Sequence, residues 1–153
     1  MRKGVEGALF NSPYGDIFDV LAPDAPDQSS FRDCLQHYKV AILMGDYPEN
    51  QAMAASLQDY VSKGGTLLLS SRHVNRVLDA GFIGAEISKD VVMSGRKLEK
   101  IGQQGCIELE YPYQCRTVTL KAAKPLLRDE NGLILASIKE HGEGRVIFCS
   151  AEN

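Results

Sequence analysis

Two apolar runs joined by an amphipathic segment dominate the first half of the chain. The runs KVAILMG (39–45) and TLLLSS (66–71) lack polar alternation, which is typical of parallel strands covered on both faces. The segment between them predicts a helix from about Pro48 to Ser62. Its apolar positions follow the i, i+4, i+7, i+8 spacing of one helix face: Met53, Leu57, Tyr60 and Val61. Together these elements predict a right-handed, parallel strand–helix–strand crossover.

The ends of this helix carry their own local signals. Pro48 suits the first turn, where its missing amide proton costs nothing, and Glu49 adds a negative charge near the positive end of the helix dipole. Lys63 falls in the last turn. The Gly64–Gly65 pair then supplies the left-handed residue that ends the helix.

Ahead of this unit, the pattern predicts a short strand and a helix. The strand covers Ile17–Leu21 and is closed by prolines at 23 and 26. The helix starts after Ser29 or Ser30, either of which can cap free amides, and places Phe31, Leu35 and Cys34 on one face.

The second half of the chain is predicted to consist mainly of strands. A short helix in HVNRVLDAGF is expected to end at Gly81, with Val74, Val77 and Leu78 on its inner side. From Ile87 onward, antiparallel strands are predicted in DVVMSG, CIELEY, CRTVTL, LILASIKE and RVIFCS, the last inside the sheet. Asn131–Gly132 and HGEGR are the turn signals.

This order of elements indicates an α/β fold, with a parallel core sheet and an antiparallel, β-rich C-terminal half. At 153 residues the chain has the size of one domain, residues 1–153, with a single core. A doubly wound sheet normally opens with a strand and helix before the strand predicted at Ile17. We therefore expect either an abbreviated N-terminal unit or a piece of a longer polypeptide.

Composition and charge exclude several classes of partner. The net charge is −3, from 17 basic and 20 acidic side chains without a long basic run, so a nucleic-acid surface is not expected. No apolar run reaches the roughly 20 residues of a membrane span, so the chain as given is expected to be soluble. The start MRKGVEGALF has too short an apolar run for a signal peptide, and the compartment stays open.

Cysteine and histidine spacing predicts neither a metal nor a cofactor. Cys34, Cys106, Cys115 and Cys149 contain no C-x-x-C pair, and buried free thiols are expected. Cys106 and Cys115 flank IELEYPYQ and are candidates to face each other across a hairpin; whether they pair stays open. Histidines 37, 73 and 141 are far apart, and aspartates 16, 19, 24 and 27 lack the spacing of a calcium loop.

Several phrases resemble one known family of domains. They are SPYGDIFDVL, HYKVAILMGD, LQDYVSKGGTLLLSS, GFIGAEI and HGEGRVIFCSAEN. These are similar to the flavodoxin-like domains of the class I glutamine amidotransferase-like superfamily, particularly the β-galactosidase trimerisation-type domains attached to glycoside hydrolases. The resemblance implies a three-layer flavodoxin-like fold that usually carries no catalytic triad and serves as an accessory or packing module.

Active members of that superfamily place a cysteine in a G-x-C-x-G elbow, and the matching place here is LLLSSRHVN. It holds no cysteine, and Arg72 and His73 stand where small residues would permit a strained turn. Ser71 as a nucleophile would need a base within hydrogen-bond reach. Cys34 and His37 are close enough on a helix to touch, but a lone helical cysteine is expected to be a small core residue.

A binding crevice is the remaining candidate site. Open α/β sheets bind their ligands at the carboxyl ends of the strands. Here the predicted strand ends are Gly45–Asp46 and Ser70–Ser71–Arg72. In one interpretation, Asp46 and Arg72 bind a sugar or a carboxylate. In the other, they cap helices and form a solvated ion pair. The YPY stretch, Tyr111–Tyr113, offers an aromatic platform for a sugar, or an ordinary hairpin edge.

Three functions follow from these observations. The first is a non-catalytic packing or oligomerisation domain of a carbohydrate-active multidomain protein, whose partner is another domain of its parent, a second copy of itself or a carbohydrate. The second is a small hydrolase or amidotransferase-related enzyme that uses Ser71 or a cysteine. The third is a polar-ligand or sugar-binding module at the strand-end crevice.

Overall fold

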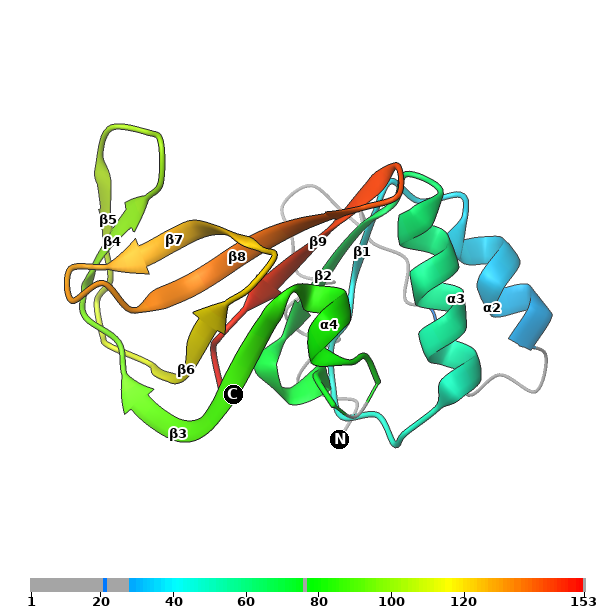
Figure 1. Ribbon diagram of the computed structural model, residues 1–153, viewed down its shortest axis with the longest axis horizontal. Helices are drawn as coiled ribbons and strands as arrows, with labels where there is room; N and C mark the ends of the chain where they lie inside the picture. Colours follow the sequence, from blue (N-terminus) through cyan, green and yellow to red (C-terminus); the bar gives the residue numbers. More distant parts are fainter. Residues whose placement is uncertain (1–20, 22–27, 76, 153) are drawn as a thin grey trace.

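The computed structural model describes residue 21, residues 28–75 and residues 77–152. They form a mixed α/β structure with a curled, mostly stranded sheet and few helices (Figure 1). The predicted strand Ile17–Leu21 lies outside the described residues except for Leu21, which packs against the larger apolar cluster.

A seven-stranded sheet in the order β1-β2-β9-β8-β7-β4-β5 runs through the molecule. Its strands are β1 (Val40–Ile42), β2 (Thr66–Ser70), β4 (Lys97–Lys100), β5 (Cys106–Glu108), β7 (Lys124–Asp129), β8 (Ile134–His141) and β9 (Gly144–Cys149). A second sheet pairs β3 (Ala85–Met93) with β6 (Gln114–Leu120). The helices are α2 (Gln28–Leu35), α3 (Gln51–Ser62) and α4 (Ala80–Ile83). Figure 1 shows α2 and α3 side by side, on one side of β1 and β2.

The predicted parallel strand–helix–strand order is confirmed. β1 and β2 are parallel, with Ile42 opposite Leu68, and α3 connects them. All four residues of the predicted apolar stripe are buried. The helix begins later than predicted, because the Asn50 side chain accepts a hydrogen bond from the Met53 amide at 3.0 Å and caps it there. Pro48 therefore lies before the helix, whereas Gly64 follows it with φ +106°, as expected.

The helix expected to end at Gly81 was placed wrongly. Residues Ser71–His73 form a 3₁₀ turn, and α4 starts only after Asp79, whose carboxylate accepts from the Phe82 amide at 2.6 Å. Gly81 lies inside α4, which ends at Gly84 with φ +71°. Aspartate is a strong N-cap, so it sets the start of the helix further along the chain than the apolar pattern did.

The strand-rich second half is confirmed, with two strands missed. β4 and β7 read KLEK and KPLLRD, and only Leu98 of β4 is buried, so their apolar pattern is weak. β9 lies inside the sheet as predicted, parallel to β2 and antiparallel to β8. The Asn131–Gly132 turn connects β7 to β8, and Gly132 has φ +82°.

The cysteine predictions were partly wrong. Cys106 and Cys115 do not face each other across a hairpin, because β5 pairs with β4 whereas β6 pairs with β3. All four cysteines are free, and Cys115 is buried as expected. Cys34 and Cys106 are exposed, so Cys34 is not the core residue that its helical position suggested.

Two apolar clusters are found among the described residues, where one core was expected. The larger one packs α3 and α4 against β1, β2 and β9, and the smaller one is centred on Leu98, Cys115 and Leu135. On β2 and β9, the residues that face α3 are almost completely buried. β1 is not covered on both faces as predicted, since Val40 and Ile42 are 56% and 50% exposed.

Removal of the Ser137 hydroxyl is expected to stabilise the fold. Its Oγ is fully buried on β8 and has no hydrogen-bond partner among the described residues. Ser137→Ala is therefore expected to raise the free energy of unfolding by about 1 kcal/mol, because an unpaired buried hydroxyl is costly. Urea unfolding measures this change.

Ser150→Ala is the matched control for that substitution. Ser150 is equally buried, but its Oγ donates to the Leu135 carbonyl at 3.4 Å. This control should lose stability, and a loss of similar size in Ser137→Ala would contradict the assignment of an unpaired hydroxyl.

Candidate functional site

The carboxyl ends of the three parallel strands β1, β2 and β9 lie together at one edge of the sheet. The predicted residues Gly45 and Asp46 follow β1, whereas Ser70, Ser71 and Arg72 end β2 and enter the 3₁₀ turn. The structure brings these two groups together through an ion pair between Arg72 Nη1 and Asp46 Oδ1 at 3.7 Å.

His73 connects the ends of β1 and β2. Its side chain is buried, its Nε2 lies 2.9 Å from the Gly45 carbonyl oxygen, and its Nδ1 lies 3.2 Å from both the amide and the hydroxyl of Ser70. Burial lowers the pKa of His73, and the hydrogen bond to Gly45 offsets only part of this effect. The ring is therefore a neutral link between two strand ends.

The Ser71 hydroxyl points toward the end of β9 and away from this histidine. Its Oγ lies 3.0 Å from the Ala151 carbonyl oxygen and 3.2 Å from Glu152 Oε1, so its single hydrogen is shared between these two acceptors. Ser70, the serine that does contact His73, has an extended backbone with φ −111°. A nucleophile elbow is strained, and that strain is absent at Ser70; among the described non-glycine residues, only Asn75 has a positive φ.

Glu152, which follows the third parallel strand β9, also belongs to this site. Arg116 on β6 hydrogen-bonds its carboxylate through Nε. That bond lowers the pKa of Glu152, burial partly opposes it, and the Ser71 hydroxyl and the Arg72 charge lower it further. Sequence reasoning missed Glu152 because RVIFCS was grouped with the antiparallel strands. Recognising that strand as parallel to TLLLSS would have brought Glu152 to the predicted edge.

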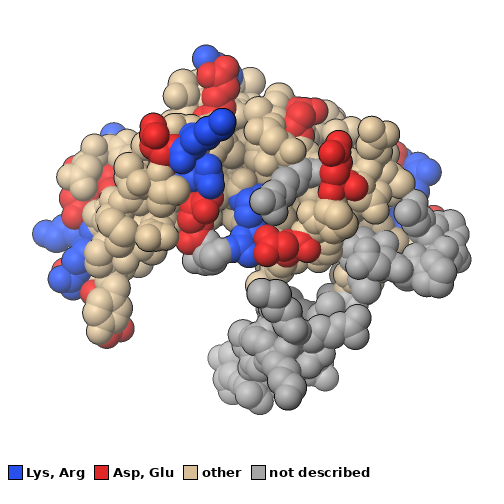
Figure 2. Space-filling view, turned by 90° about the horizontal axis from the view of Figure 1, so that it is seen from below, with Lys and Arg blue, Asp and Glu red and all other residues tan. Residues whose placement is uncertain are grey.

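These strand-end groups are largely used inside the fold. The two arginines pair with two carboxylates, Ser70 contacts His73 in its own turn, and Ser71 and His73 have partners on neighbouring strand ends. The Arg72–Asp46 pair is the solvated ion pair that the sequence analysis considered, with Asp46 63% exposed. Figure 2 shows acidic and basic side chains mixed on the face seen from below, without an extended surface of one sign.

The tyrosines of YPY are in different environments. Tyr111 is 72% exposed, whereas Tyr113 packs against the smaller apolar cluster. Burial raises the pKa of Tyr113 to about 12, and the nearby thiols and Asp129 contribute. The two rings therefore differ too much in exposure to form the flat sugar platform considered from the sequence.

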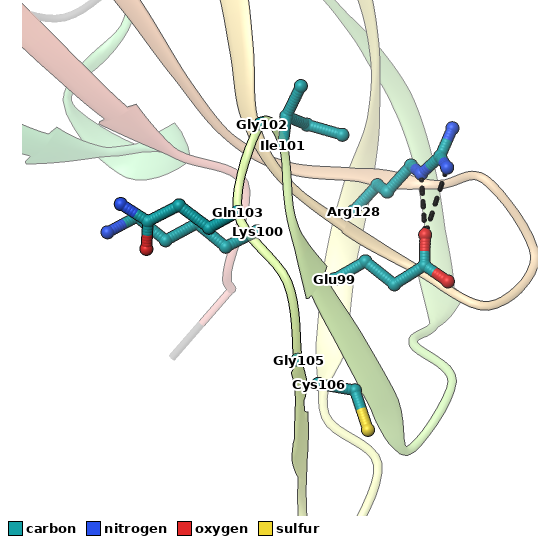
Figure 3. A pocket seen from close by; sticks show the side chains of 8 residues that line it. All are labelled: Glu99, Lys100, Ile101, Gly102, Gln103, Gly105, Cys106 and Arg128. Carbon is teal, nitrogen blue, oxygen red and sulfur yellow. Dashed lines mark hydrogen bonds and ion pairs between the residues drawn. The ribbon is translucent and has the colours of Figure 1, made fainter.

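A shallow hollow of about 560 Å³ lies elsewhere, beside the β4–β5 hairpin. It is lined by Glu99, Lys100, Ile101, Gly102, Gln103, Gly105, Cys106 and Arg128. Figure 3 shows these side chains pointing apart, with Glu99 and Arg128 paired to each other. Ligand sites have converging polar groups in an enclosed pocket, so this hollow is a weak candidate.

In the part of the chain that the structure describes, no group of three or more His, Cys, Asp or Glu side chains is arranged to hold a metal ion. No helix within the same residues has the length and apolar character needed to cross a membrane.

Comparison with known proteins shows a likeness in fold alone. No protein-family model matches the sequence, and no curated protein matches it significantly. The structure is similar to a β-galactosidase of the haloarchaeon Halorubrum lacusprofundi, with a TM-score of 0.61 and 17% identity over 87% of this chain and 21% of that chain. It is also similar to a β-galactosidase from Rahnella sp. R3, with a TM-score of 0.59 and 15% identity over 80% of this chain and 21% of that chain.

A cytoplasmic protein of Salmonella typhimurium is also similar, with a TM-score of 0.59 and 15% identity over 87% of this chain and 65% of that chain. The present chain thus spans about a fifth of the β-galactosidases that it resembles.

Proposed function

We propose that this chain is a non-catalytic packing or oligomerisation domain of a carbohydrate-active multidomain protein. The observation that carries this proposal is an apolar surface on the sheet, turned away from α3. We call it the outer face; it consists of Val40, Ile42, Met44, Leu68, Ile138 and Ile147.

The outer face follows from strand alternation. Ala41, Leu43, Leu67 and Leu69 contribute to the cluster that packs with α3, so their neighbours in sequence point the other way. Ile42, Leu68, Ile147 and Ile138 form one row across four adjacent strands. Val40, Ile42 and Met44 are 44–56% exposed.

Parallel strands are normally covered on both faces, and contiguous exposed apolar patches mark docking sites. A second domain of a parent protein, or a second copy of this chain, would bury the outer face. The likeness to one segment of longer β-galactosidases supports the first of these, in which this chain is one domain of a longer protein.

The same proposal includes the finer fold assignment, a flavodoxin-like domain of the class I glutamine amidotransferase-like type. Its support is the β1–α3–β2 crossover and the insertion of β9 parallel to β2 in the same sheet. The non-catalytic part is supported by the internal use of Ser71 and His73 and by the unstrained backbone at Ser70.

The test compares wild type with Ile42→Lys. Wild type is expected to bind the apolar dye ANS and to self-associate with rising concentration in analytical ultracentrifugation. Ile42→Lys should weaken both, because a charge at the exposed end of the row opposes its burial. Ile107→Lys, which replaces a 57% exposed isoleucine on β5, is the matched control and should behave as wild type.

Two results would contradict the proposal. One is equal dye binding and association in wild type and Ile42→Lys. The other is hydrolysis of aryl glycosides or aryl esters by the purified chain that is lost in Ser71→Ala, since turnover at that residue requires a catalytic site.

A further inference from the structure

We propose that His73 is a pH-sensitive connection between the ends of β1 and β2, which releases the loop carrying Asp46 and Tyr47 on acidification. This inference is independent of the proposed packing function. It rests on the hydrogen-bond geometry of one buried ring.

Both ring nitrogens of His73 have assigned roles, because each has a partner of fixed polarity. The Gly45 carbonyl can only accept, so Nε2, 2.9 Å away, carries the hydrogen. The Ser70 amide can only donate, so Nδ1, at 3.2 Å, must be an unprotonated acceptor. The connection therefore requires the neutral tautomer with hydrogen on Nε2.

A second proton on the ring would be added at Nδ1. It would point at the Ser70 N–H, so two donors would face each other and the bond from the Ser70 amide would be lost, with only the Ser70 hydroxyl, 3.2 Å away, left to accept from the ring. The ring is 2% exposed, so water cannot replace this partner without an opening of the site.

The charged groups around the ring lie on both connected segments. Arg72, on the same turn, disfavours a positive ring, whereas Asp46, on the loop after β1, favours it. Tyr47 lies beside the ring with centroids 6.4 Å apart. Glu152, at the end of β9, interacts electrostatically with Arg72 and lies within hydrogen-bond distance of the Ser71 hydroxyl. Asp46 is exposed, so a protonated ring that moved outward would approach it.

The direction of the pH effect follows from burial. The folded pKa of His73 lies below the ordinary value of 6.5, so an opened site binds the proton better than the closed one. The connection is fully present above pH 6.5. The open population then rises by up to about tenfold per pH unit below 6.5, until the folded pKa is reached.

The loop is the part expected to respond. β1 has only three residues and stands at one end of the described strand order, and residues 43–50 after it form neither helix nor strand. Segments with few buried contacts open at low free-energy cost. Loss of the His73 connection should therefore free Gly45–Tyr47 and the turn Ser71–Asn75, while α3 stays closed.

Hydrogen–deuterium exchange of the full chain at pH 7.5, 6.5 and 5.5 tests this proposal, after correction for intrinsic exchange. The amides of both segments should open several-fold to about tenfold more at pH 5.5 than at pH 7.5. His73→Gln is the key variant, because its side-chain oxygen and amide group can reproduce both bonds without titrating. It should retain protection and lose the pH dependence.

His37→Gln is the control, since His37 is exposed on the segment after α2, and it should behave as wild type. Nitrogen NMR of the wild-type ring provides a readout that needs no variant: Nδ1 should be unprotonated at neutral pH and gain its proton below pH 6.5. Exchange that does not change with pH in wild type, a pH dependence that survives in His73→Gln, or hydrogen on Nδ1 at pH 7.5 would each overturn the proposal.

Discussion

Gly144→Ala is expected to lower the free energy of unfolding by about 3 kcal/mol or more. A Cβ at this position would lie 2.2 Å from the carbonyl oxygens of both Gly65 and Val61. These are backbone atoms at the end of α3, which cannot rotate away as a side chain would. The methyl group would therefore push the β8–β9 turn off the end of the helix.

That contact also involves two hydrogen bonds that the displacement would break. The Glu143 amide donates to the Ser62 carbonyl at 3.0 Å, and the Arg145 amide donates to the Gly65 carbonyl at 3.1 Å. Loss of these bonds adds to the steric cost. Urea unfolding at pH 7 measures the change.

Gly102→Ala is the matched control. Gly102 has φ +79° with open space around its missing Cβ, so alanine there costs only the backbone strain, about 1 kcal/mol. The close-packing account of Gly144 fails if both substitutions cost the same.

Asp129→Asn is expected to lower the free energy of unfolding by about 2–4 kcal/mol. Asp129 is 1% exposed at the end of β7. Its Oδ2 accepts from the Gly95 amide at 2.6 Å, and its Oδ1 accepts from the amides of Asn131 and Leu133 at 2.9 and 2.8 Å. Asparagine has one acceptor oxygen, and its NH₂ group would face an amide donor on the other side.

The loss should depend on pH. Burial raises the pKa of Asp129, but the amides of Gly95, Leu133 and Asn131 outweigh it and lower the pKa below 3.8. The carboxylate then contributes its full stability above pH 3.8 and loses it as the pH falls through the folded value. Urea midpoints of wild type and Asp129→Asn should differ most at pH 7 and converge at low pH.

Asp90→Asn controls for the loss of one carboxylate. Asp90 is exposed, and its interactions are with Ser88 on the same strand. Its substitution should change the unfolding free energy by less than about 0.5 kcal/mol. A similarly small change in Asp129→Asn would show that the three amides find other partners.

The elements that the sequence predicted well are those specified by neighbouring residues. The four-residue stripe of α3, the glycines after it and the Asn131–Gly132 turn all depend on side chains or backbone preferences within a few positions. Even the errors at helix starts have local causes, since Asn50 and Asp79 are caps within a few residues of the expected boundary.

The strand-end position of the candidate residues could be predicted for the same reason. Strand ends can be read from apolar runs, and this placed Gly45, Asp46, Ser70, Ser71 and Arg72 at one edge. Their chemical use could not be read that way. Whether Ser71 bonds a histidine or Glu152 depends on β9 lying parallel to β2, and the two residues are 81 positions apart.

What remained beyond the sequence was the pairing of distant segments. β4 and β7 are strands because of their partners, and one oxygen of the buried Asp129 is paired because the Gly95 amide, 34 residues earlier, donates to it. Local propensity acts over a few residues and can be read from the chain. Register between remote strands is selected by the total burial and hydrogen bonding of the folded molecule, which no short stretch of residues contains.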